Sequence, residues 1–127
     1  MTYRRFEELP AWQTARKLVR DVCRFAEKDD FRRNWGFRDQ IQKAAMSTMA
    51  NIAEGFSRRS DREFVQFLFT AKASAAELQS HLYAALDLGY LDEATFRGYY
   101  SQADLLARQL SGLISYLTGH RSRIVRG

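Results

Sequence analysis

Cysteine and proline are almost absent from this 127-residue chain, which contains one of each. The lone Cys23 excludes an intrachain disulfide and suits a reducing compartment, so we expect a cytoplasmic protein. No apolar run is long enough to span a bilayer, and residues 1–10 lack the apolar core of a secretory signal. These absences predict a soluble, helix-rich protein without a membrane partner.

Residues that commonly build an active site are also scarce. The two histidines, His81 and His120, have no glutamate three residues before them, as a di-iron helical bundle would require. Glu77 and His81 are four residues apart, a spacing more typical of a surface pair than of metal ligands. There is no glycine-rich phosphate loop, no paired zinc-ligand motif and no nucleophile elbow. We therefore expect a non-enzymatic protein without metal or cofactor.

Positive charge is present but unevenly distributed. The formal net charge is +5, and three of the 20 basic residues, Arg121, Arg123 and Arg126, lie close to the carboxyl terminus. Residues 120–127 therefore read as a short basic tail that can contact a polyanion. Arginine greatly outnumbers lysine, which suits phosphate binding but also follows from the base composition of some genomes.

Apolar residues recur every three or four positions through most of the chain, which is the period of amphipathic helices. The predicted helices span residues 10–29, 37–54, 61–88 and 93–118, and no alternating pattern indicates a strand. Because short connections make neighbouring helices antiparallel, we expect one all-α domain over residues 1–127, an antiparallel up-down-up-down four-helix bundle. In the last two predicted helices the spacing between apolar residues alternates strictly between three and four, as in a coiled-coil seam. These residues are Phe64, Leu68, Ala71, Ala75, Leu78, Leu82 and Ala85 in the third helix, and Phe96, Tyr99, Ala103, Leu106, Leu110, Leu113 and Leu117 in the fourth.

The connection between the second and third predicted helices carries the most specific local signals. Gly55 is expected just past a helix end in a left-handed conformation, where only glycine avoids a Cβ penalty. Ser60 and Glu63 have the spacing of a capping box, in which each side chain binds the other residue's amide. Glu54 lies in the last helical turn, where its charge requires a nearby cation, and Asn51 precedes it on the same face. We interpret Asn51 and Glu54 as fastening this corner, with direct ligand contact as the alternative.

Two basic clusters are candidate nucleic-acid contacts. Arg58, Arg59 and Arg62 surround the turn beside Phe56, which is expected to be exposed and to stack on bases. The second cluster follows the first predicted helix and consists of Arg16, Lys17, Arg20 and Arg24. Each cluster has a structural alternative, namely a solvated loop with intrahelical ion pairs and the ordinary polar face of an amphipathic helix.

Aromatic residues exceed what one helical seam needs. Apolar surface outside the core of a small protein commonly marks a subunit interface, so we expect a homo-oligomer, with a widened core as the alternative. The aromatic residues that lie off the seam are Phe56, Phe67, Phe69, Tyr83, Tyr90, Tyr100 and Tyr116.

A longer pattern resembles the signature of the four-helix-bundle proteins encoded within intervening sequences of bacterial 23S ribosomal RNA genes. The resemblance covers residues 6–117, although the bulkier and more polar Met46-Ser47-Thr48-Met49 departs from it. Its matching positions are Asn51-Ile52-Ala53-Glu54-Gly55, Arg58 or Arg59, Ser60, Glu63-Phe64, Phe67-Leu68, Ala71, Ser74 and Glu77-Leu78, with Leu9, Trp12-Gln13-Thr14-Ala15, Gln40-Ile41, Ala44-Ala45 and Leu88-Gly89-Tyr90-Leu91 as flanks.

The resemblance implies a homopentamer without catalytic residues. The family is also similar to the accessory variability determinant of diversity-generating retroelements, which binds nucleic acid and a reverse transcriptase through a basic surface. The resemblance therefore implies binding of RNA or DNA. A scaffold that recognises a protein, such as a reverse transcriptase, is the alternative.

Overall fold

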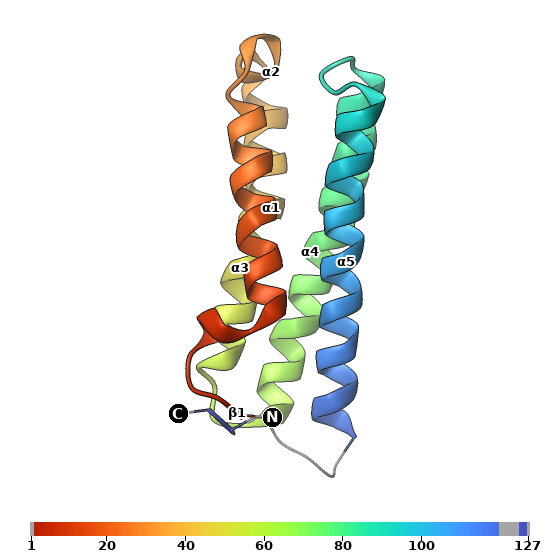
Figure 1. Cartoon of the computed structure of the whole chain (residues 1–127). Coiled ribbons are helices and arrows are strands. Elements are labelled where there is room, and N and C mark those ends of the chain that lie inside the picture. Colours follow the sequence, from red (N-terminus) through yellow and green to blue (C-terminus); the bar gives the residue numbers. More distant parts are fainter. Residues whose placement is uncertain (1, 120–124, 127) are drawn as a thin grey trace.

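The computed structural model of this chain describes residues 2–119 and 125–126, which form five α-helices, one 3-10 helix and two very short strands (Figure 1). In chain order the elements are β1 (Thr2–Tyr3), η1 (Phe6–Glu8), α1 (Pro10–Ala26), α2 (Asp29–Arg33), α3 (Trp35–Phe56), α4 (Asp61–Asp87), α5 (Glu93–Thr118) and β2 (Val125–Arg126).

The four long helices, α1, α3, α4 and α5, lie side by side (Figure 1). Helix α3 packs against α1 and α4, and α5 packs against the same two helices, so each long helix has two main neighbours around the core. Helix α2 and the α4–α5 connection lie at one end of the molecule. The α3–α4 connection lies at the other end, together with the amino end of α1. The predicted all-α class is confirmed.

The apolar stripes meet in the core largely as the sequence predicts. All seven expected positions of α4 are buried. In α5, however, Tyr99 and Leu113 are only partly buried, and Ile114 is buried where Leu113 was expected. An α-helix has 3.6 residues per turn, so a strict seven-residue repeat drifts by about 20° per heptad and the next residue takes over the core position.

The first predicted helix is wrong at its carboxyl end. Helix α1 stops at Ala26, and a separate short helix, α2, begins at Asp29. The break allows Phe31 to enter the core, where it is 3% exposed and stacks on Phe37 with 5.4 Å between the ring centroids. Packing of one aromatic side chain thus ends a helix that periodicity alone would extend.

The short strands were not expected from the sequence. Thr2 pairs with Val125 and Tyr3 with Arg126 in a parallel arrangement. A strand of two residues is too short to show the alternation that identifies strands in a sequence. The pairing gives part of the predicted basic tail a backbone partner, while Arg121 and Arg123 lie outside the described residues.

The amino end of α5 makes a pH-dependent contribution to stability. The Asp92 carboxylate accepts a hydrogen bond from the Thr95 amide at 2.7 Å, which lowers the pKa of Asp92 below its usual value of 3.8. Because the folded chain binds this proton less readily than the unfolded chain, the contribution is complete above the unfolded-state pKa and is lost as the pH falls through the folded-state pKa.

We expect Asp92→Asn to lose less stability than the parent protein when the pH falls below about 4. Asparagine also caps helices but does not titrate, so the variant keeps the hydrogen bond at low pH. Thermal unfolding followed by circular dichroism between about pH 6 and pH 2.5 measures the difference. Identical pH dependence in the two proteins would show that this cap does not contribute.

Candidate nucleic-acid interface

The α3–α4 turn, residues 57–60, holds its arginines in different environments. Arg58 lies against the protein, because its guanidinium pairs with the Glu54 carboxylate at 3.0 Å and its carbon lies 4.8 Å from the centroid of the Phe67 ring. Its Nε is buried and has no hydrogen-bond partner within residues 2–119. Arg59 and Arg62 are exposed. Arg58 therefore supplies the cation that Glu54 needs, and Arg59 and Arg62 are the more accessible members of the cluster.

Two expectations about this turn are wrong. Phe56 is only 7% exposed and packs edge-on against Phe64, with 6.0 Å between the ring centroids, so it is not placed to stack on bases. Gly55 does not follow the helix in a left-handed conformation, because α3 continues through Phe56. In the described part of the chain only Gly89, just after α4, has a positive φ among the glycines, at +81°.

Gly55 is required for a different reason, the close approach of α3 and α4. A Cβ atom added to Gly55 would lie 2.6 Å from the Phe67 Cβ and 2.9 Å from the Phe64 Cδ1. The first distance is well below van der Waals contact. Glycine therefore allows the two helices to meet just before the turn.

Hydrogen bonds of the other signature residues also hold this corner. The Ser60 Oγ accepts a hydrogen bond from the Glu63 amide at 3.1 Å, which is one half of the expected capping box, and it donates to the Glu63 carboxylate at 3.2 Å, so this carboxylate binds the Ser60 hydroxyl instead of the Ser60 amide. Asn51 Nδ2 donates to the Ser47 carbonyl at 2.8 Å, and the Ser47 Oγ lies 2.8 Å from the Ser74 Oγ of α4. These contacts favour the structural interpretation of the signature.

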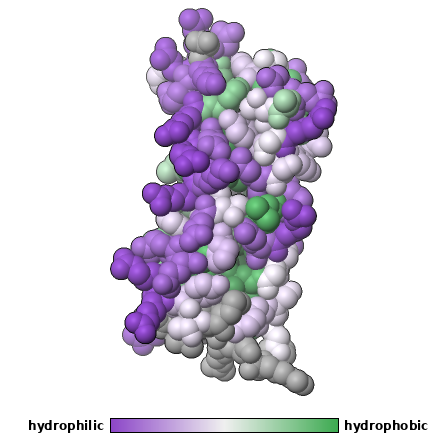
Figure 2. Space-filling model, in the orientation of Figure 1, coloured by the Kyte–Doolittle hydropathy of each residue, from purple (hydrophilic) through white to green (hydrophobic). Residues whose placement is uncertain are grey.

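The cations of α1 lie on the outer side of the helix. All four are exposed, and Figure 2 shows hydrophilic residues gathered along the side of the molecule where α1 lies. Arg20 pairs with Asp21 at 3.3 Å, and the Arg16 guanidinium lies 5.7 Å from the centroid of the Trp12 ring. Lys17 and Arg24 form no ion pair within the residues that the structure describes. We name Arg16, Lys17, Arg20 and Arg24 the α1 stripe.

The two predicted clusters form separate surfaces. The α3–α4 turn lies at one end of the molecule, whereas the α1 stripe extends along the side of α1 away from that end (Figure 1). Three further exposed cations follow the stripe, namely Lys28, Arg32 and Arg33, and the last two were not singled out from the sequence. The closeness of these three cations in the sequence could have indicated a longer basic surface. The unexpected break between α1 and α2 falls among them, so a continuous helical face did not reveal them.

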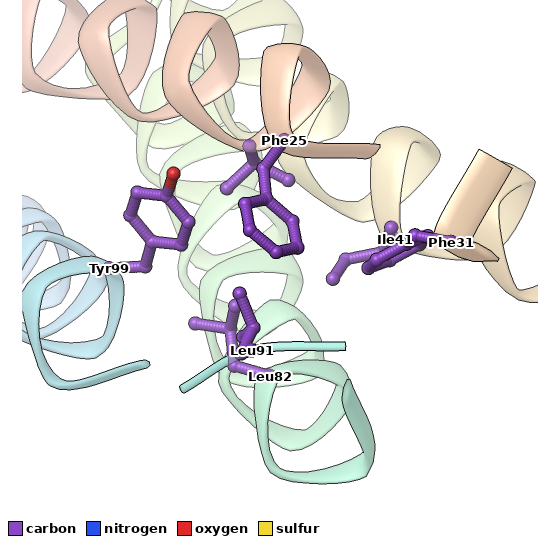
Figure 3. Close-up of a pocket in the computed structure, with 7 residues that line it drawn as sticks. Phe25, Phe31, Ile41, Leu82, Leu91 and Tyr99 are labelled. Carbon is purple, nitrogen blue, oxygen red and sulfur yellow. The ribbon is translucent and has the colours of Figure 1, made fainter. Parts of the chain in front are cut away.

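A gap in the core near α2 has no room for a ligand. Figure 3 shows the side chains of Phe25, Phe31, Ile41, Leu82, Leu91 and Tyr99 converging on it. Essentially no volume inside it is open to a water-sized molecule. The Tyr99 hydroxyl donates to the Asp21 carbonyl at 3.5 Å, and burial, followed by the nearby Asp21 charge, raises the pKa of Tyr99. This gap is a feature of core packing.

Within residues 2–119 and 125–126, no group of three or more histidine, cysteine, aspartate or glutamate side chains is arranged to hold a metal ion. None of the helices in the same part of the chain has the length and apolarity needed to cross a membrane.

Known proteins share the sequence pattern and the fold. Residues 7–112 match the family described as 23S rRNA-intervening sequence protein. Among solved structures, the chain is similar to a protein with unknown function from the S23 ribosomal protein family of Bacteroides thetaiotaomicron VPI-5482. The match has a TM-score of 0.75 and 17% sequence identity, and it covers 82% of this chain and 97% of that chain. At this identity the likeness shows the fold alone. A search of curated proteins found no significant match.

Proposed function

Because this chain belongs to the 23S rRNA-intervening sequence protein family, we propose that it is a non-enzymatic protein that binds the backbone of RNA or DNA. In this proposal the protein is a cytoplasmic homopentamer of single-domain, antiparallel up-down-up-down four-helix bundles. The α1 stripe carries the proposal, because four exposed cations lie within residues 16–24 and only one of them is ion-paired within the described residues.

The α1 stripe suits contact with a phosphate backbone. An α-helix rises about 1.5 Å per residue, so Arg16 and Arg24 are separated by about 12 Å along the axis. A nucleic-acid duplex carries one negative charge per about 1.7 Å of its own axis, so several phosphates lie within reach of the stripe. Such contacts give affinity without sequence readout.

Oligomerisation strengthens this proposal. One copy of the stripe releases few counterions, and Asp21 offsets part of its charge. A ring repeats the stripe, so that a long nucleic acid meets several copies at a high effective concentration. Arg59 and Arg62 of the turn, and Arg121 and Arg123 of the tail, are proposed as additional contacts.

The salt dependence of binding tests this function. We expect the logarithm of the binding constant to fall linearly with the logarithm of KCl concentration, with a slope of about −3 or steeper if each stripe contacts three or four phosphates. Fluorescence anisotropy with labelled RNA and DNA of unrelated sequences, between about 50 and 300 mM KCl, gives the slope for each. A slope near zero, or one sequence preferred by more than about tenfold, would contradict backbone binding.

A protein-interaction scaffold, including an accessory subunit of a reverse transcriptase in a diversity-generating retroelement, is the second candidate. It is favoured by exposed apolar side chains on α4 and α5, where Phe69 is 53% exposed, Tyr83 51% and Leu105 43%. A reverse transcriptase that remains bound after nuclease treatment and about 0.5 M salt would support this function, because salt of that strength weakens backbone contacts.

A further inference from the structure

A cavity of about 250 Å³ lies between the amino end of α1 and the second half of α5. An apolar cavity of about 150 Å³ accepts benzene in an engineered protein, so this one has room for a bicyclic ring. The wall is mainly apolar and includes Tyr3, Leu9, Pro10, Gly112, Leu113 and Tyr116.

One polar group in the cavity wall has no partner. The side-chain oxygen of Gln109 is buried and accepts no hydrogen bond within the described residues. The terminal torsion of glutamine is broad, so the amide can turn this oxygen toward a donor that enters the cavity. The best-fitting occupant is therefore an apolar group of bicyclic size that carries one hydrogen-bond donor.

The chain presents such a group on its own surface. Trp35, the first residue of α3, is 74% exposed and is the most exposed large hydrophobic residue of the described chain. Its ring lies 5.4 Å from the guanidinium carbon of Arg38, and its indole N–H has no hydrogen-bond acceptor in residues 2–119. A tryptophan that becomes buried usually finds a partner for this N–H.

Trp35 and the cavity lie at opposite ends of the bundle, so a copy cannot fill its own cavity. Trp35 begins α3 beside α2, whereas the cavity lies beside the amino end of α1 (Figure 1). A contact between two different surfaces is heterologous. Symmetric rings with an odd number of subunits require contacts of this kind, because two-fold contacts generate even numbers.

We propose that Trp35 of one copy inserts into the cavity of the next copy and donates its indole N–H to Gln109. Each subunit then gives one tryptophan and receives one. This inference rests on the self-association in the proposed function and names the residues that mediate it.

Two glycines of α5 provide the test and its matched control. Gly112 lines the cavity and Gly98 does not, yet both are exposed within the helix and neither has an atom within 4 Å of an added Cβ. Gly112→Leu places a side chain in the cavity, whereas Gly98→Leu adds the same side chain elsewhere on α5. Light scattering should give about five chain masses for the parent protein and Gly98→Leu, and about one for Gly112→Leu and Trp35→Ala.

The outcomes separate this inference from the proposed function. Assembly of Gly112→Leu like the parent protein would overturn the cavity contact and leave the pentamer intact. A monomeric parent protein would overturn both, while nucleic-acid binding would still be decided by the anisotropy measurement.

Fluorescence gives a second readout. The chain has two tryptophans, so Trp12→Phe leaves Trp35 as the only one. Its emission is expected at a shorter wavelength in the assembled protein than in the Gly112→Leu background. Emission at the wavelength of a solvated indole in an assembled protein would overturn the proposal.

Discussion

Replacing Lys17, Arg20 and Arg24 together by glutamate is expected to lower the affinity for nucleic acid by more than about 100-fold at about 0.1 M salt. Each lost phosphate contact removes about one released counterion, so the salt slope should become shallower by about three for each stripe engaged. All three side chains are exposed, and Arg20 alone has an ion-pair partner within the described chain. The free energy of unfolding should therefore change little. Anisotropy titrations and thermal unfolding measure the two effects.

A second triple variant with the same net charge tests whether the position of the lost cations, rather than the total charge, determines the affinity for nucleic acid. Glutamate at Lys43, Arg97 and Arg108 changes the net charge equally, but these residues lie on α3 and α5 and pair with acids of their own helices at 3.1, 3.1 and 3.8 Å. We expect this variant to lose less than about tenfold in affinity. Equal losses in the two triple variants would show that net charge, rather than the α1 stripe, controls binding.

Gly55→Ala is expected to destabilise the protein by about 1–3 kcal/mol, the range found for overpacked cores. Helix propensity alone predicts the opposite, because alanine is favoured over glycine in a helix interior by about 1 kcal/mol. The added Cβ would lie 2.6 Å from the Phe67 Cβ and 3.3 Å from the Phe64 carbonyl oxygen. Both atoms belong to or adjoin the backbone of α4, so that helix must shift to relieve the contact.

Gly98→Ala is the control for this prediction. The position is helical and exposed, with no atom within 4 Å of the added Cβ, so propensity should act alone and raise stability by about 0.5–1 kcal/mol. Urea denaturation at one protein concentration compares both variants with the parent protein. If Gly55→Ala were stabilising to the same extent, α3 and α4 would not approach each other as closely as described here.

Much of the helical framework could be predicted because burial imposes a period on the sequence. Phe64 through Ala85 of α4 are buried at every expected position. The break after Ala26 could not be predicted, because it depends on where Phe31 packs once the other helices are in place. Ile114 occupies the core position expected for Leu113, because the position that faces the core drifts relative to a seven-residue repeat along a long helix.

The signature turn shows why correct residues can receive wrong roles. Glycine is required at Gly55 either for a left-handed conformation or for close helix contact, and the sequence does not distinguish the two. Once α3 is known to continue through Phe56, Glu54 and Arg58 fall one helical turn apart and their ion pair follows. The same continuation places Phe56 against Phe64 rather than in solvent.

The close approach of α3 and α4 has a consequence for the order of folding. These helices are joined by residues 57–60, so their contacts form at a small cost in loop entropy. Helix α1 is joined to α3 by a longer segment that includes α2, and its other neighbour, α5, lies far along the chain, as in the hydrogen bond between Tyr99 and Asp21, which are 78 residues apart. We therefore expect the α3–α4 hairpin to form first and α1 to dock later. The α1 stripe would then reach its final position only after the α3–α4 hairpin has folded.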